Sequence, residues 1–310
     1  MMNDIKSKVY KFNYSAIEEI WYIMLSLSDT TASMPEVSQG EHGTYMFSCE
    51  TMMSAMNTII SIDFCCDRGA YSDAYTLIRK YRDDLMQYLF VLNVIQNLEK
   101  NSYSDTEDFN FIELLSDPEK LFEILQKDMA AFVSGEKKTD AEKAMEAWIH
   151  NKLEYDYNYR KRYFDTVRYK DYLIRDNNDV KYVMDNFLFK YWKDVDRKLN
   201  NYVHGNGKKY IQDNYVYKSN KESRDTELIE TLQDITSLFL SLLAIIDSTK
   251  LRSSDYLDAL EMGFEPEQES AYWICPCIVE YMNDNLEKEL LGFLQNREKN
   301  GMKYLGEYYT

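Results

Sequence analysis

The sequence predicts an all-α protein, and three observations lead to this fold class. The chain has 310 residues but only 10 Gly and 4 Pro, far below the roughly 12% that average usage gives, which disfavours turn-rich β-folds and Gly-loop nucleotide binders. Apolar residues recur at every third or fourth position through most of the chain, which is the helical period. Residues typical of helix caps mark the breaks between these segments.

The first third of the chain is expected to form helices over residues 15–28, 44–66 and 72–97. A loop over residues 29–43 contains Pro35 and Gly40, and residues 67–69 form a turn that ends in Gly69. The helix over 72–97 has a continuous apolar stripe and is expected to lie in the core. The stripe consists of Ala74, Leu77, Ile78, Tyr81, Leu85, Tyr88, Leu89 and Leu92.

Cap residues place the helices of the middle region. Asp117 followed by Pro118 predicts a helix start, and Gly135 predicts its end. Thr139 and Glu142 have the spacing of a capping box, which predicts that a further helix begins there. A basic, tyrosine-rich stretch follows over residues 155–175.

Three more helices are expected in the C-terminal part, over residues 180–204, 225–247 and 278–295. The first of them stops at the sequence Gly205-Asn206-Gly207, a strong helix terminator. A loop lies around residues 263–276. Because the sequence has no internal repeat and no low-complexity linker, we expect residues 1–310 to form a single helical domain.

Charge and cysteine content restrict the partners and the compartment. Lys and Arg number 36 against 53 Asp and Glu, a formal charge of −17, so any contact with nucleic acid has to be a local basic patch. The five cysteines are an odd, clustered set, which favours a reducing cytoplasm over a disulfide framework. The longest apolar run, residues 238–246, is about half a membrane span, and no membrane step is expected.

The most informative segment is the helix expected over residues 180–204. Its apolar residues form one stripe on a helix of 3.6 residues per turn: Leu188, Trp192, Val195, Leu199 and Val203. Arg197, Asn201 and His204 fall on the opposite face, and Lys198 is also expected to face solvent. A guanidinium, an amide and an imidazole therefore point the same way, outside the core of the monomer.

Arg197 and His204 suit phosphodiester chemistry. An imidazole transfers protons near neutral pH, and a guanidinium holds a phosphate through two hydrogen bonds. His204 lies in the last expected helical turn, where the negative end of the helix dipole favours the protonated ring. The simpler interpretation is a solvated helix face that ends in a glycine cap.

The stretch from Arg197 to His204, with the sequence RKLNNYVH, resembles the Arg-x4-6-His motif of the HEPN superfamily. This superfamily of helical proteins includes many prokaryotic toxin and abortive-infection ribonucleases. Residues 68–83 are similar to the second helix of HEPN-like proteins, in which an Ala-x2-Leu-x-Arg pattern precedes an acidic residue. In this sequence the pattern falls on Ala74, Leu77 and Arg79, followed by Asp83.

The resemblance implies a HEPN-like up-and-down four-helix bundle core over residues 44–100 and 180–247, with a helical insertion over 101–179 and a C-terminal helical extension over 251–310. It also implies a homodimer and metal-independent RNA cleavage, in which the 2′-hydroxyl attacks the adjacent phosphate. His204 is then the general acid or base, Arg197 binds the phosphate, and Asn201 orients the imidazole. Arg79 and Asp83 are secondary candidates on the neighbouring helix.

Three functions stay open on the sequence alone. The first is an RNA endonuclease of a prokaryotic antiphage-defence or toxin system in the cytoplasm. The second is a catalytically silent HEPN-like module that binds a partner protein or RNA, since a fold does not secure an activity. In the third, an associated nucleotidyltransferase modifies the chain, so a nucleotidyltransferase or an antitoxin is an expected partner.

Basic residues among aromatic ones are typical of single-stranded RNA recognition, although a basic face that balances an acidic neighbour has the same composition. The RNA-binding candidates are Arg160, Arg162, Arg168, Lys208 and Lys209.

No metal and no cofactor is expected. The cysteines at 65–66 and 275–277 lack the intervals of a structural zinc site. The sequence has neither a phosphate-binding Gly loop with a Lys nor a nucleophile elbow, which disfavours kinases, dehydrogenases and serine hydrolases.

Overall fold

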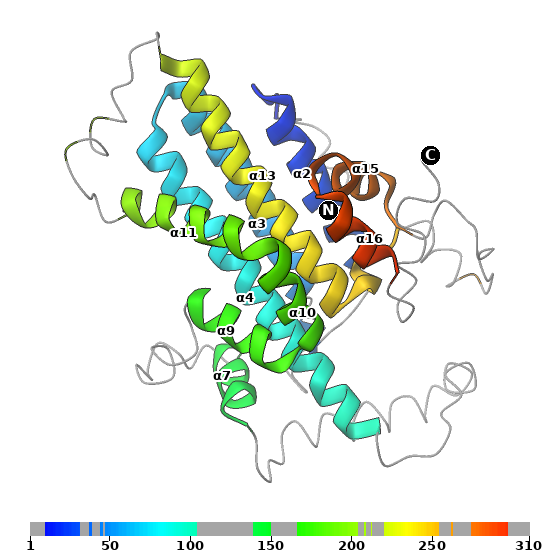
Figure 1. The fold of residues 1–310 in the computed structure, drawn as a ribbon. Helices are drawn as coiled ribbons and strands as arrows, with labels where there is room; N and C mark the ends of the chain where they lie inside the picture. Colours follow the sequence, from blue (N-terminus) through cyan, green and yellow to red (C-terminus); the bar gives the residue numbers. More distant parts are fainter. Residues whose placement is uncertain are drawn as a thin grey trace.

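The computed structural model describes residues 10–31, 37–38, 44–45, 47–103, 139–149, 166–203, 208, 212, 220–253, 262 and 274–296. In this part of the chain the regular secondary structure is helical except for two short antiparallel strands, β1 (Val37–Ser38) and β2 (Thr44–Tyr45). The predicted all-α class is therefore confirmed (Figure 1).

Three helices form the N-terminal part: α2 (Ser15–Thr31), α3 (Phe47–Arg68) and α4 (Tyr71–Tyr103). Several boundaries differ from the prediction: α2 ends at Thr31 rather than at residue 28, and α3 ends at Arg68 rather than at residue 66. The helix predicted from residue 44 begins at Phe47, because Thr44 belongs to β2, and α4 continues past residue 97 into a polar stretch. The sharp turn between α3 and α4 depends on Gly69, whose φ of 72° lies in the left-handed region that strains any residue with a Cβ.

The middle of the chain contributes α7 (Asp140–Ile149), α9 (Thr166–Asp176), α10 (Asn178–Val183) and α11 (Phe189–Val203). The single helix predicted over 180–204 is wrong in one respect, because a π-helical turn, η3 (Met184–Leu188), separates α10 from α11. Asn177 caps α10, as its side-chain oxygen accepts two backbone N–H groups at 3.0 and 3.2 Å. The helix predicted over residues 118–135 lies outside the described residues.

The C-terminal part has α13 (Lys221–Ile246), a 3-10 turn η5 (Ser248–Leu251), α15 (Pro276–Asn285) and α16 (Lys288–Gln295). The helix predicted over 278–295 is two helices, because Leu286 and Glu287 adopt extended backbone between them. The Tyr191 hydroxyl of α11 donates to the Glu287 carboxylate at 2.7 Å. A tertiary contact therefore holds the residue at which the helix breaks.

Contacts near the helix ends define the directions of the long helices. Cys66 at the end of α3, Tyr71 at the start of α4 and Asp225 near the start of α13 meet at one end of the molecule. Helices α4 and α13 therefore run parallel to each other, and α3 runs antiparallel to both (Figure 1).

Helix α11 runs antiparallel to α4 and packs against both α4 and α13. Arg82 of α4 contacts Asp196, while Tyr75, nearer the start of α4, stacks on Tyr202 near the end of α11 with ring centroids 4.0 Å apart. In chain order, α3, α4, α11 and α13 thus alternate in direction.

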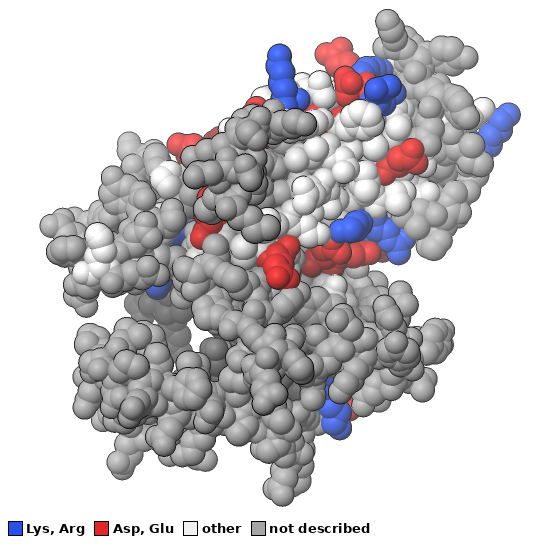
Figure 2. Space-filling model, turned by 180° about the vertical axis from the view of Figure 1, so that it is seen from behind, with Lys and Arg blue, Asp and Glu red and all other residues white. Residues whose placement is uncertain are grey.

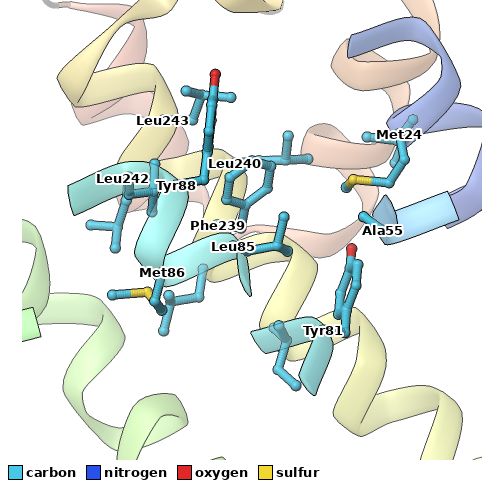
Figure 3. Close-up of a cluster of buried hydrophobic side chains, with 14 of the residues drawn as sticks. Met24, Ala55, Tyr81, Leu85, Met86, Tyr88, Phe239, Leu240, Leu242 and Leu243 are labelled. Atoms are coloured by element: carbon cyan, nitrogen blue, oxygen red, sulfur yellow. The ribbon is translucent and has the colours of Figure 1, made fainter. Parts of the chain in front are cut away.

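The apolar core lies between α2, α3, α4 and α13, and Figure 3 shows side chains from these helices meeting there. Two buried hydroxyl pairs cross it: Tyr81 with Thr236 at 3.1 Å and Ser48 with Tyr88 at 2.9 Å. Full burial of one large apolar side chain stabilises a fold by about 1.5–3 kcal/mol. Most of the stripe predicted on α4 is buried: Ala74, Ile78, Tyr81, Leu85, Tyr88, Leu89 and Leu92.

By length and composition alone, α13 is apolar enough to cross a membrane, but 78% of its most apolar window is buried inside the protein. Such burial is typical of the central helix of a helical core, and the position of α13 against α2, α4, α10 and α11 agrees with it.

Candidate functional site

The outer face of α11 carries the predicted site. The residues predicted to be apolar and buried are buried where the structure describes their side chains: Leu188, Trp192, Val195 and Leu199. Arg197 lies on the opposite face, with 76% of its side chain exposed, and its guanidinium pairs with the exposed Asp194 at 3.3 Å. The outward position of Arg197 is therefore confirmed, with most of its side chain exposed to solvent.

Two flanking residues fix the rotation of α11 about its axis. Asp196, one position before Arg197, accepts a hydrogen bond from Arg82 of α4 at 3.0 Å. Lys198, one position after it, donates to Thr231 of α13 at 2.9 Å and lies 3.7 Å from Glu227. Since neighbouring residues differ by about 100° around a helix, these two contacts leave Arg197 pointing outward between them.

The solvent-facing position predicted for Lys198 is wrong. The helical count gave its angle correctly, but α13 lies on that flank, so the ammonium group meets Thr231 and Glu227. Only 30% of the Lys198 side chain is exposed.

Arg82 is a buried charge that the sequence analysis missed. Its guanidinium donates to Asp83 at 2.9 Å and to Asp196 at 3.0 Å, and it lies over the Trp192 ring at 5.6 Å. Lys170 of α9 also lies near the same ring, at 5.9 Å. Because its donors are engaged in this way, the Arg82 guanidinium links α4 to α11 and does not serve as a ligand-binding group.

The secondary candidates Arg79 and Asp83 lie together on α4, joined by an ion pair of 3.6 Å. Asp83 also accepts hydrogen bonds from Arg82 and from Thr166 at the start of α9. Arg79 has one buried guanidinium nitrogen that lacks a hydrogen-bond partner in the described structure. Their contacts therefore connect α4 to α9, whereas the ion pair of Arg197 is with Asp194 on α11 itself.

The remaining predicted residues are placed only in part. Asn201 is half-buried on α11, and Arg168 on α9 and Lys208 are exposed. His204, Arg160, Arg162 and Lys209 lie outside the described residues.

A second polar centre, around Asp225, was also missed by the sequence analysis, which expected this residue as a helix start. Asp225 lies inside α13 and is 8% exposed. Its carboxylate accepts hydrogen bonds from Tyr71 at 2.6 Å, Tyr14 at 2.8 Å, Lys221 at 2.9 Å and the Cys66 thiol at 3.3 Å. Burial alone raises the pKa of Asp225, but these donors together hold it below its ordinary value. This centre ties the ends of α3, α4 and α13 to the segment before α2.

Asp234 is another acid of α13 that is partly buried. It lines a small recess with Arg82, Trp192 and Val195. Burial raises the pKa of Asp234 to about 6, Lys198 opposes this, and Glu230 and Asp194 add to it. The carboxyl next to the inner side of α11 therefore loses its proton at a higher pH than an ordinary aspartate.

The outer face of α3 differs from that of α11. Between Glu50 and Asp67 its only charged residue is Asp63, which is buried and accepts hydrogen bonds from Tyr10 and Asn13. Met53 and Phe64 are exposed there. Figure 2 views the molecule from the side of α3 and shows uncharged surface bordered by acidic and basic side chains. The outer face of α11 thus carries exposed charges, whereas the outer face of α3 carries few.

Within the described ranges, no group of three or more His, Cys, Asp or Glu side chains could hold a metal ion.

Comparison with protein-family models, with curated proteins and with solved structures finds no match for this chain. The geometry of the described residues is therefore the basis on which a function is proposed.

Proposed function

We propose that this chain is a HEPN-like, metal-independent RNA endonuclease of a prokaryotic antiphage-defence or toxin system, acting in the cytoplasm as a homodimer. The observation that carries the proposal is the outward Arg197 on α11, held in place by the contacts of Asp196 and Lys198. The alternating directions of α3, α4, α11 and α13 support an up-and-down arrangement over residues 44–100 and 180–247, to which α2 adds a further helix that packs on α3 and α13.

In the proposed reaction the RNA 2′-hydroxyl attacks the adjacent phosphorus, and the bond to the 5′-oxygen breaks. The products carry a 2′,3′-cyclic phosphate and a 5′-hydroxyl. Arg197 binds the non-bridging oxygens, on which charge develops, and His204 moves the proton. Asn201 orients the imidazole, and a second copy brings a matching set of these groups to the same cleft.

RNA binding is proposed to use local positive charge, because the overall charge of −17 repels a phosphate backbone. The exposed Arg168 and Lys208 are described members of this set, and Arg160, Arg162 and Lys209 complete it. Binding through phosphates weakens as salt increases, since bound counterions are released.

The test is cleavage of transfer RNA and total RNA by the purified protein in the presence of a chelator. His204→Ala is expected to reduce the rate by about 10²-fold or more, the low end for general acid–base catalysis, and Arg197→Ala by about 10²-fold. Lys181→Ala is the matched control, because Lys181 is an exposed cation on α10. Intact RNA over a wide concentration range of folded wild-type protein contradicts the nuclease.

Asp194→Asn sharpens the test. An exposed ion pair such as Arg197–Asp194 contributes only about 0–1 kcal/mol, so its removal is expected to leave the fold intact and to free the guanidinium for phosphate. Cleavage by this variant is expected to equal or exceed that of the wild type.

The second candidate function is a catalytically silent HEPN-like module that binds a partner. The ion pair between Arg197 and Asp194 favours it, because a neighbouring carboxylate partly neutralises the guanidinium. Capture of an antitoxin or a nucleotidyltransferase from the native host, together with inert protein in the cleavage assay, supports this alternative.

The dimer is tested by light scattering after size exclusion. If two copies meet through α11, Phe64→Glu on the exposed face of α3 leaves the dimer intact. Loss of the dimer in this variant instead places the interface on α3.

A further inference from the structure

Two cysteines flank Pro276 at the start of α15. Cys275 is the residue that precedes the helix, Pro276 is its first residue, and Cys277 follows. Both thiols are free and partly exposed, and their sulfur atoms lie 3.2 Å apart. This places two sulfur nucleophiles in direct contact in a partly exposed part of the molecule.

Three segments hold this pair in place. The Ser26 hydroxyl of α2 lies 3.4 Å from the Cys277 sulfur. The backbone N–H of Cys275 donates to the Leu251 carbonyl of η5 at 3.0 Å, and the Cys275 carbonyl accepts from the N–H of Ile278 at 2.9 Å. The pair is therefore built into the junction of α2, η5 and α15.

We propose that Cys275 and Cys277 form a redox-active dithiol that undergoes thiol–disulfide exchange with a low-molecular-weight disulfide of the glutathione type. The proposal is independent of the RNA chemistry proposed for α11.

The exchange has two steps. The Cys275 thiolate attacks one sulfur of the small disulfide, the disulfide bond breaks, and the released thiolate takes up a proton. Cys277 then loses its proton and attacks the Cys275 sulfur, which forms the internal disulfide and releases the second small thiol. Two electrons pass from the two cysteine sulfurs to the small disulfide, which is reduced to two thiols.

The environment assigns the attacking role to Cys275. The hydrogen bond from Cys277 lowers the pKa of Cys275 to about 6 against the opposing effect of burial, and Ser26 adds to the lowering. The partial positive charge at the start of a helix favours a thiolate in the same way. The same hydrogen bond raises the pKa of Cys277. Cys277 is thus the resolving thiol, which acts once Cys275 carries an adduct.

Bond formation requires only a small movement. The sulfur atoms approach from 3.2 Å to a bond length of about 2.05 Å.

The first experiment treats the reduced full-length protein with glutathione disulfide and maps its peptides without reduction. The wild type is expected to lose two hydrogen atoms from the peptide that contains residues 275–277. Cys277→Ser is expected to accumulate glutathione on Cys275, and Cys275→Ser is expected to form neither product at a comparable rate. Cys65→Ser is the matched control, since Cys65 is also partly exposed, and it behaves as the wild type.

The second experiment measures alkylation of Cys275 by iodoacetamide as a function of pH. The midpoint is expected at a pH of about 6. At pH 6, Cys275 reacts on the order of tenfold faster than an ordinary thiol, because the gain in thiolate outweighs the lower nucleophilicity of a weakly basic sulfur. Cys277→Ala removes the hydrogen-bond donor and raises the midpoint, whereas Cys277→Ser retains an O–H donor and keeps it lower.

Either of two results overturns the proposal in protein whose helical content is unchanged. One is glutathione attached to Cys49 and Cys65 while residues 275–277 stay reduced. The other is an alkylation midpoint for Cys275 at the ordinary thiol value of about 8.5.

Discussion

Asp225 and Asp234 are two acids of one helix with opposite electrostatic behaviour. Asp225 is the more buried of the two residues, yet its pKa lies below the ordinary value, whereas the pKa of Asp234 is raised to about 6. Four donors reach the Asp225 carboxylate: two tyrosine hydroxyls, an ammonium and a thiol. In the described structure no hydrogen bond to the Asp234 carboxylate is found. Burial raises the pKa of both carboxyls, and the four donors outweigh it at Asp225, whereas Lys198 only partly opposes it at Asp234.

The two acids also differ in what they do for the molecule. Asp225 joins the end of α3 to the start of α4 through its hydrogen bonds with Cys66 and Tyr71, close to the turn at Gly69. Asp234 lies about 13 Å further along α13, nine residues later, on the opposite side of the helix. There it faces the recess beside Arg82 and α11. One site is a fixed structural charge, and the other is a titrating group next to the proposed functional helix.

Asp225→Ala is expected to lower the free energy of unfolding by about 3 kcal/mol. The substitution leaves Lys221 and two tyrosine hydroxyls without their shared acceptor, and removal of one partner from a buried charged network typically costs 3–5 kcal/mol. Denaturant unfolding followed by circular dichroism measures it. Asp185→Ala, at an exposed position of η3, is the control. A loss equal to that of the control contradicts a structural role for Asp225.

The lowered pKa of Asp225 determines how its contribution to stability changes with pH. Because its folded pKa is below the unfolded value, its contribution is complete above the unfolded pKa of about 4 and is lost as the pH falls through the folded pKa. The difference between the wild type and Asp225→Asn is therefore expected to be large at pH 7 and to shrink under acid conditions.

Removal of a single donor has the next largest effect. Tyr71→Phe deletes the 2.6 Å hydrogen bond to Asp225 and is expected to cost about 1.5–3 kcal/mol, the range for hydrogen bonds to charged groups. The pKa of Asp225 should rise at the same time. Tyr182→Phe, at an exposed tyrosine of α10, is expected to change stability little. Equal stability of the two variants contradicts the donor argument.

Asp234→Asn tests the other half of the comparison and is expected to stabilise the protein at pH 7. A raised pKa means that ionisation opposes folding, so wild-type stability from this group is greatest below the unfolded pKa and falls as the pH rises through about 6. After allowance for solvent screening of this partly exposed group, the gain is on the order of 1 kcal/mol. Thermal unfolding of both proteins between acid and neutral pH measures it. A gain that persists at low pH contradicts this explanation.

The helices of the fold could be predicted from sequence to a large extent, because an apolar stripe is a local property. The stripe of α4 and the buried side of α11 are both confirmed. The breaks at η3 and at Glu287 could not be predicted, since the contact that holds Glu287 comes from Tyr191, distant in sequence. The sequence predicts residue 225 as a helix start, whereas three of the four donors to Asp225 come from outside α13, namely Tyr14, Cys66 and Tyr71.

The candidate site was predicted in part for the same reason. Helical spacing gives the angle of Arg197 relative to the core, and the structure agrees. Spacing does not say which helix lies on each flank, so Lys198 was assigned to solvent although it contacts α13. The buried position of Arg82 could have been predicted from the sequence, because Arg82 occupies the i+4 position after Ile78 on the apolar stripe of α4. A charge on such a stripe indicates a buried pair.

The smallest expected effect comes from Lys198→Met. The Lys198 ammonium lowers the pKa of Asp234, but it is shared with Thr231 and Glu227. Its removal is therefore expected to raise the pKa of Asp234 further. The measurement compares the pH dependence of stability of Lys198→Met with that of the double variant Lys198→Met/Asp234→Asn. The pH at which their stabilities begin to differ should be higher than for the wild type and Asp234→Asn. Lys193→Met, at an exposed position of the same helix, is expected to leave that pH unchanged. A downward shift contradicts this explanation, because it indicates that the neighbouring acids, and not Lys198, determine the pKa of Asp234.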